Sequence, residues 1–87
     1  MKLILCTKCQ DVVRLIQENE RSCECGNCSG QYTDELNAWY KGDTVIPLGF
    51  ANNTLLMALL NQPDCGWGEN FTAFVIPKEC DTFKKKP

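Results

Sequence analysis

The stretch "CECGNCSG", residues 23–30, places Cys23, Cys25 and Cys28 within six positions of one another. It follows "CTKC", residues 6–9, after a spacer of thirteen residues. Tetrahedral metal sites often take two ligands from each of two tight turns, and this spacing is typical of a zinc ribbon. Because the chain contains no histidine, the ligands would all be sulfur. We therefore predict a structural zinc ion in the N-terminal part of the chain.

The second pair of ligands is less clear than the first. Cys25 and Cys28 repeat the two-residue gap that separates Cys6 from Cys9. Cys23 and Cys25 form a CxC arrangement, and the glycine that follows them would let backbone amides turn toward the sulfur atoms. From the residues alone, both sets of four ligands stay open.

Length and cysteine content indicate a single small domain in a reducing compartment. A chain of 87 residues has a marginal core, so a metal ion would add needed stability. The seven cysteines are an odd number, and "MKLIL" is too short for the apolar part of a signal peptide. The longest apolar run, Leu55 to Leu60, is too short to span a bilayer. We predict a cytoplasmic protein with no membrane association.

Charge is distributed unevenly along the chain. The formal net charge is −2, but residues 1–83 carry six basic and eleven acidic side chains, a balance of −5. The remaining positive charges are Lys84, Lys85 and Lys86, in a tail (residues 81–87) that we expect to be disordered. Because nucleic-acid binding depends on neutralising phosphates, this acidic body disfavours a nucleic-acid partner.

Most of the chain shows strand-like patterns separated by turn residues. Residues 1–30 are predicted to form a zinc-ribbon-like part with short strands, one of them at residues 11–17. Residues 31–80 contain further strands, ending with "FTAFVIP" at residues 71–77. The step Lys41-Gly42-Asp43 predicts a hairpin turn, since glycine adopts positive φ easily.

One helix is predicted at about residues 53–61, where "ANNTLLMALLNQP" provides capping residues, an apolar run and a terminating proline. Because it is apolar on nearly every side, we expect it to be buried as the main core element. The predicted fold is therefore a single α+β domain over residues 1–87, mostly β, with an N-terminal zinc ribbon and one buried α-helix.

A few residues outside the cysteine clusters are candidates for binding. Asn52, Asn53 and Thr54 lie at the start of the predicted helix, where free amides can hold an anion, although an ordinary helix cap explains them as well. Trp67 lies between two glycines and could anchor a partner or fold back over the core. The last two cysteines, Cys65 and Cys80, are predicted to be buried free thiols.

Several segments share a pattern that covers nearly the whole chain: "CTKCQDVVRL", "SCECG", "SGQY", "LNAWYKG", "IPLGFAN", "NQP" and "FTAFVIPKEC". Together they resemble a family of small bacterial and phage-encoded proteins with a CxxC…CxCG…GFAN…FVIP pattern. In that family the position of Cys28 is not reliably a cysteine. The resemblance therefore implies Cys6, Cys9, Cys23 and Cys25 as the ligands, with Cys28 as the alternative, and it implies no established activity.

Catalytic chemistry finds little support in the sequence. No histidine is present to activate a serine or cysteine, and the carboxylates show no paired motif. We predict a non-enzymatic, zinc-stabilised binding protein, encoded by a phage or mobile element, that contacts a host protein and inhibits a host defence. The alternatives are a nucleic-acid-binding zinc ribbon and a sponge for a small anionic or nucleotide ligand.

Overall fold

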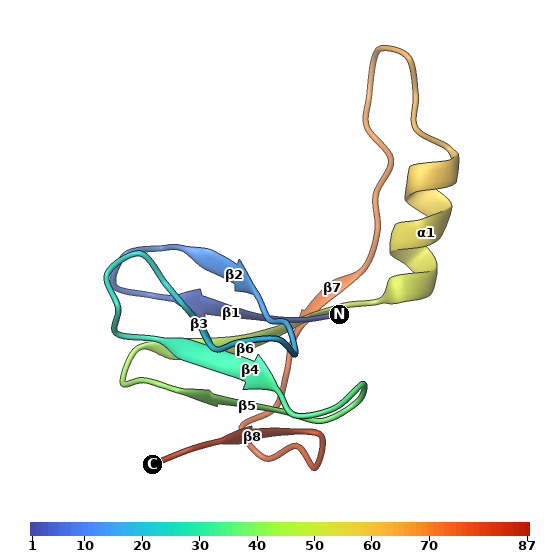
Figure 1. The fold of residues 1–87 in the computed structure, drawn as a ribbon. Helices are drawn as coiled ribbons and strands as arrows, with labels where there is room; N and C mark the ends of the chain where they lie inside the picture. Colours follow the sequence, from blue (N-terminus) through green and yellow to red (C-terminus); the bar gives the residue numbers. More distant parts are fainter.

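Two four-stranded sheets and one short helix make up the computed structural model, which describes all residues 1–87 (Figure 1). The first sheet has the order β2-β1-β6-β7 and is antiparallel throughout; its strands are β1 (Lys2–Cys6), β2 (Val12–Arg14), β6 (Val45–Phe50) and β7 (Ala73–Val75). The second has the order β3-β4-β5-β8, formed by β3 (Arg21–Ser22), β4 (Ser29–Tyr32), β5 (Ala38–Lys41) and β8 (Phe83–Lys85). With the helix α1 (Asn52–Leu60), this mostly-β architecture fits the predicted α+β class.

Residues from both sheets form one hydrophobic core. In β6 the side chains alternate, with Val45 buried and its neighbour half-buried, as expected for a strand with one face toward the core. Ile4 of β1 is fully buried, and Tyr40 of β5 packs edge-on against Phe83 with 4.7 Å between ring centroids. Leu15, just after β2, is 1 % exposed. The two-sheet part of the molecule, called the body below, therefore has a closed core of its own.

The predicted disordered tail is wrong. Residues Phe83–Lys85 form β8, which pairs in parallel with β5 and places Phe83 opposite Ala38. Phe83 is fully buried, so it anchors a segment whose other residues are lysines. Burial of one aromatic side chain and a strand ladder outweigh the repulsion between neighbouring lysines, which stay exposed.

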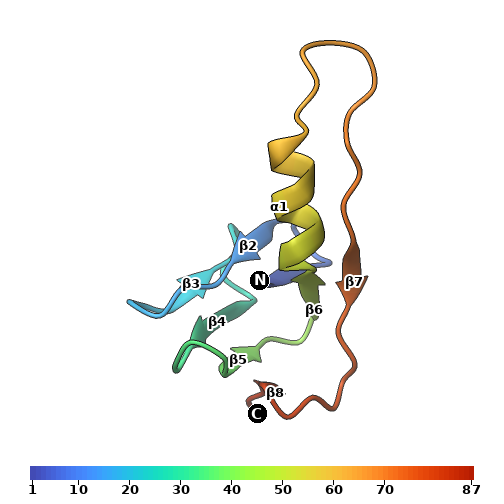
Figure 2. The same ribbon diagram turned by 90° about the vertical axis from the view of Figure 1, so that its right-hand side faces the viewer.

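The predicted burial of the helix is also wrong. The helix α1 lies one residue earlier than predicted, and none of its residues is buried. Together with the returning segment 61–72, it forms an arm that extends from the body (Figures 1 and 2). The radius of gyration is 14.1 Å, against about 12 Å for a compact chain of this length. The body fills its core without the helix, which leaves Leu56, Met57, Leu59 and Leu60 of α1 exposed and its other apolar residues half-buried. The helix is too short to cross a membrane.

The step at Gly42 is not a hairpin turn. It connects β5 of one sheet to β6 of the other, so the two flanking strands are not partners. Gly42 has φ 135°, and a Cβ at this position would lie 2.4 Å from the carbonyl oxygen of Asn27. Glycine is required here because the connection between the sheets passes directly over the turn that contains Cys28.

Candidate metal centre

Four cysteine sulfurs converge at one end of the body. The Sγ atoms of Cys6, Cys9, Cys23 and Cys25 all lie within 4.8 Å of one another, and the four could hold a metal ion. The Sγ of Cys25 is 3.6 Å from that of Cys6 and 3.5 Å from that of Cys23. A tetrahedral ion with metal–sulfur bonds of about 2.3 Å needs sulfurs about 3.8 Å apart, so the observed spacing suits such an ion.

The first two sulfurs come from the turn between β1 and β2. The backbone N–H of Gln10 donates to the carbonyl oxygen of Cys6 at 2.7 Å, and the N–H of Cys6 donates to the carbonyl oxygen of Asp11 at 3.0 Å. Gln10 has φ 63°, which is uncommon for a residue with a side chain. This left-handed residue directly after Cys9 turns the chain back, so that both sulfurs face the same point.

The second turn, between β3 and β4, resembles the first but is one residue shorter up to its second cysteine. The N–H of Gly26 donates to the carbonyl oxygen of Cys23, three residues back, at 3.0 Å, whereas the N–H of Gln10 donates to that of Cys6, four residues back. Gly26 has φ 81° and directly follows Cys25. In each turn, the residue with positive φ therefore directly follows the second of the two cysteines that the turn contributes to the cluster. By this correspondence Cys25, rather than Cys28, is the counterpart of Cys9.

Cys28 has a different role in the same turn. Its carbonyl oxygen accepts from the N–H of Cys23 at 2.9 Å, which is the position that Asp11 occupies in the first turn. Its own N–H donates to the Sγ of Cys23 at 3.3 Å. The Cys28 thiol is fully buried but lies outside the group of four. Cys28 thus supports the cluster through its backbone.

Two residues that the sequence analysis missed connect the parts of this site. The hydroxyl of Thr44 lies 3.4 Å from the Sγ atoms of both Cys6 and Cys28. Asp11 accepts a hydrogen bond from the N–H of Glu24 at 2.9 Å, which joins the first turn to the second. Neither residue has a spacing that would mark it in the sequence, because both reach the site through tertiary packing.

The four thiols do not share protons equally. Hydrogen bonds from the Thr44 hydroxyl and from the backbone of Cys9 lower the pKa of Cys6 to about 5. The backbone N–H of Asn27 favours the thiolate of Cys25, but desolvation of its sulfur within the cluster and hydrogen bonds with Cys23 and Cys6 raise its pKa to about 12. Thiolates this close repel one another. A divalent cation bound at this point would remove that repulsion and displace the remaining protons.

Comparisons with known proteins give no further guide to this centre. No family model, no curated protein and no solved structure matches the chain. The resemblance to small bacterial and phage-encoded proteins stays a prediction.

The residues predicted to bind an anion are partly used within the fold. Asn52 accepts a hydrogen bond from the N-terminal amine of Met1 at 2.8 Å. The Thr54 hydroxyl donates to the carbonyl oxygen of Ala51 and accepts from the N–H of Thr72, both at 2.9 Å. These two side chains attach the start of α1 to the body and to the returning segment.

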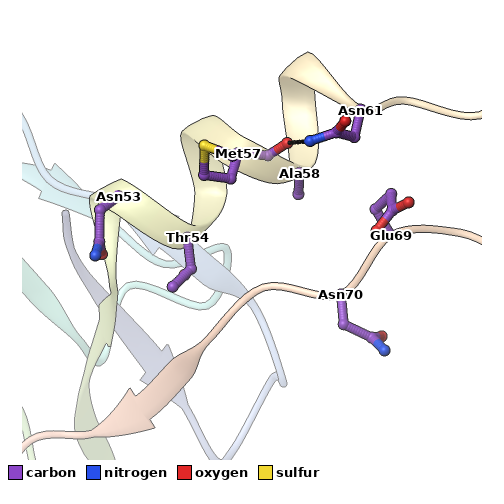
Figure 3. Close-up of a pocket in the computed structure, with 7 residues that line it drawn as sticks. All are labelled: Asn53, Thr54, Met57, Ala58, Asn61, Glu69 and Asn70. Carbon is purple, nitrogen blue, oxygen red and sulfur yellow. Dashed lines mark hydrogen bonds between the residues drawn. The ribbon is translucent and has the colours of Figure 1, made fainter.

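A hollow of about 250 Å³ lies beside them between α1 and the returning segment, lined by Asn53, Thr54, Met57, Ala58, Asn61, Glu69 and Asn70 (Figure 3). Its only charged side chain is Glu69. A carboxylate and three amides, with no lysine or arginine, make a poor site for a phosphate.

The remaining candidates lie on or near the arm. Trp67 is 95 % exposed near the tip of the arm, so the prediction that it could fold back over the core is wrong. Cys65 is exposed, which corrects the prediction of a buried thiol, whereas Cys80 is partly buried beside the core. Sequence reasoning could not separate these environments, because the loop that carries Cys65 and Trp67 has no pattern that marks its position in the fold.

Proposed function

We propose that this chain is a non-enzymatic, zinc-stabilised binding protein that uses its arm to dock on a protein partner. The observation that carries the proposal is the exposure of the arm. Large apolar residues are exposed on α1 and on the returning segment: Leu56, Met57, Leu59, Leu60, Trp67 and Phe71. A folded chain that leaves so many apolar side chains uncovered on one extension is suited to burying them against another molecule.

Zinc is the metal that the cluster suits best. Four thiolates in a tetrahedral arrangement select zinc or iron–sulfur chemistry, and the distances between sulfurs match a single ion with bonds of about 2.3 Å. Four protein ligands leave no open coordination position, so the role would be structural. Metal analysis of freshly purified protein should find one zinc per chain, and chelation should unfold the body. A protein that keeps its near-ultraviolet circular dichroism without metal would contradict this part of the proposal.

The exposed area of the arm is close to that of a protein interface. Fully exposed aliphatic and aromatic side chains present roughly 100 to 200 Å² each, so the six residues, which are 39 % to 95 % exposed, present between roughly 400 and 800 Å². The largest apolar patch on a typical monomer is about 300 to 600 Å². A standard interface buries about 800 Å² per partner. The arm therefore offers up to one partner's share of an ordinary complex.

The helix itself also requires support from outside the chain. Isolated helices shorter than about 12 to 15 residues are marginal in water, and α1 has nine residues with no side-chain cap. Its first and last turns carry no charge that would favour the helix dipole. Packing is the remaining source of stability, and no residue of α1 is buried. A bound partner would stabilise the helix that the free chain holds weakly.

Charge favours a protein over a membrane or a nucleic acid on this surface. Residues 51–77 contain Asp64 and Glu69 and no lysine or arginine. Anionic lipids and phosphates would both be repelled. A protein with an apolar groove and basic residues at its rim complements the arm best. The expected phage origin and host-defence target stay predictions from the sequence.

Site-specific photo-crosslinking in bacterial cells tests the arm. A benzoylphenylalanine replaces Leu60, Trp67 or, as the control, Glu18 on the body, which is also exposed. Discrete protein adducts should form at the two arm positions and not at position 18. Equal adducts at all three positions, or none, would contradict the proposal. An adduct of twice the chain mass would identify the partner as a second copy and contradict the prediction of a host protein.

A further inference from the structure

A second surface, on the opposite side of the body from the arm, combines one aromatic side chain with several lysines. It lies on the outer face of the second sheet, where β5 and β8 pair in parallel. The register places Trp39 opposite Lys84, so both side chains project from the same face of the sheet. The inward neighbours Tyr40 and Phe83 are buried, whereas Trp39 is only partly covered. The Trp39 indole therefore lies outside the core, although its neighbours Tyr40 and Phe83 are buried within it.

Lysine ammonium groups surround this indole. The Nζ of Lys86 lies 4.0 Å from the centroid of the Trp39 ring, and the Nζ of Lys41 lies 5.6 Å from it. The segment after β8 is held in place, because the N–H of Lys86 donates to the carbonyl oxygen of Tyr40 at 2.7 Å. Lys86, which the sequence analysis placed in a loose tail, is thus held over the Trp39 ring.

The positive charge of this surface is mostly uncompensated. The chain has one salt bridge, in which Lys41 lies 3.6 Å from Glu20. Lys84 and Lys86 have no acidic partner within that distance, although Asp81 lies in the same region. The unpaired Lys86 ammonium over the ring, with Lys84 on the same face of the sheet, is available to an anion that also offers a flat surface.

A hollow of about 410 Å³ adjoins the platform, lined by Thr33, Asn37, Ala38, Trp39, Asp81, Lys84 and Lys86. Small-molecule sites usually have volumes of about 300 to 1,000 Å³, so the hollow can accept one nucleotide. The single carboxylate of Asp81 is positioned among the lysines and could accept a hydrogen bond from a base or sugar.

From this arrangement we propose that the surface formed by Trp39, Lys84 and Lys86 binds a nucleotide. The base stacks on the indole and displaces the Lys86 ammonium from the ring face. Lys86 and Lys84 then bind the phosphates. An aromatic side chain stacks on any base because every base has a flat π face, and each ammonium adds a charge-assisted contact to a phosphate oxygen.

A single nucleotide fits this surface better than a nucleic-acid strand. Only one aromatic side chain is available for stacking, and residues 1–83 have a net charge of −5. Phosphates of a longer strand would extend from the lysines onto this acidic surface and be repelled. The site is separate from the arm and does not depend on the proposed protein partner.

Calorimetric titration of the full, metal-loaded chain tests the site with three probes. ADP contains both the base and the phosphates, adenosine contains only the base, and inorganic pyrophosphate contains only the phosphates. We expect ADP to bind at least tenfold more tightly than either partial probe. No measurable binding of ADP at millimolar concentration, or equal affinity for ADP and pyrophosphate, would overturn the proposal.

Variants locate the binding. Replacing both lysines (Lys84→Ala with Lys86→Ala) should weaken ADP binding at least tenfold and leave adenosine binding nearly unchanged. The control Lys78→Ala removes an exposed lysine elsewhere and should change neither. In a Trp67→Phe background, Trp39 is the only tryptophan, so ADP should quench the remaining fluorescence. Equal weakening by Lys78→Ala, or no quenching, would overturn the assignment.

A single-stranded nucleic acid of ten nucleotides tests whether the surface binds a free nucleotide or a nucleic-acid strand. We expect it to bind no more tightly than ADP. An affinity that rises with strand length and falls steeply with salt would overturn the commitment to a free nucleotide and identify a nucleic-acid surface.

Discussion

Both the two-sheet body and the arm are rich in large apolar side chains, but only the body buries them. In the body, Ile4, Leu15 and Phe83 are at most 1 % exposed. In the arm, Leu59 and Leu60 are 65 % and 72 % exposed, and α1 has no buried residue. The difference shows that hydrophobic content alone does not assign a segment to the core of its own chain. High hydrophobic content marks a surface that is suited to burial, and this burial can occur against another molecule.

The largest expected effect is the loss of one cluster sulfur. Cys23→Ser leaves three thiolates and should unfold the body, because structural zinc contributes about 10 to 16 kcal/mol to folding in small zinc domains. Circular dichroism and zinc content measure the result. The matched control is Cys65→Ser, a change of the same kind on the exposed arm, which should alter neither. If both variants keep their zinc and fold, the cluster is not structural.

The next effect tests whether the C-terminal segment belongs to the body. Phe83→Ala should lower the free energy of unfolding by about 3 to 5 kcal/mol, since it empties a fully buried aromatic position. Lys85→Ala, in the same strand but exposed, should change it by less than about 0.5 kcal/mol. Chemical denaturation measures both. Similar midpoints for the two variants would mean that β8 contributes little to the core.

A smaller effect is expected from the hydroxyl beside the cluster. Thr44→Val keeps the shape of the side chain but removes the hydrogen bonds to the Cys6 and Cys28 sulfurs. Loss of such a supporting contact typically weakens metal binding by about 10- to 100-fold, which competition with a zinc indicator can measure. Thr33→Val is the control, because the Thr33 hydroxyl donates to the carbonyl oxygen of Asn37 and contacts no cysteine of the cluster. Equal affinities for the two variants would exclude a role for Thr44 in tuning the site.

The smallest change in stability is expected from a leucine-to-alanine substitution in the arm, which is compared with the same substitution in the body. Leu60→Ala should change the free energy of unfolding by less than about 0.5 kcal/mol, because the side chain is already exposed. Leu15→Ala should cost about 2 to 5 kcal/mol, since Leu15 is buried. A large loss of stability in Leu60→Ala would show that the arm packs against something in the free protein, such as a second copy.

The sequence predicted local features well and tertiary ones poorly. The spacing of the cysteines predicted that two tight turns would bring their sulfurs together, because such ligand pairs are set by residues close in the chain. It left open whether Cys23 or Cys28 joins Cys25, and the set that lies together was implied only by the resemblance. The position of the helix followed from its apolar run and Pro63, which are likewise close in the chain. The exposure of the helix could not be predicted. An apolar pattern shows that a face is suited to burial, but it does not show which part of the chain or which other molecule buries it.

Phe83 and Thr44 show why tertiary contacts could not be predicted from the sequence. One phenylalanine before three lysines gives no strand pattern, and its pairing with β5 joins residues 45 positions apart, such as Ala38 and Phe83, in a parallel ladder. Thr44 approaches Cys6 and Cys28 only because the connection after Gly42 crosses between the sheets. Such contacts depend on topology, which a single sequence does not specify.

The connection of the arm to the body has an evolutionary consequence. Phe50 of β6 and Ala73 of β7 are paired residues, and the N–H of Ala51 donates to the carbonyl oxygen of Thr72 at 2.9 Å. The chain therefore leaves and re-enters the body at adjacent points, as in an ordinary β-hairpin with a long loop. Residues 51–72 can lengthen, shorten or be replaced without changing any strand register in the body. Related chains could keep the metal centre and core while exchanging this one insertion, and so acquire new partners on an unchanged scaffold.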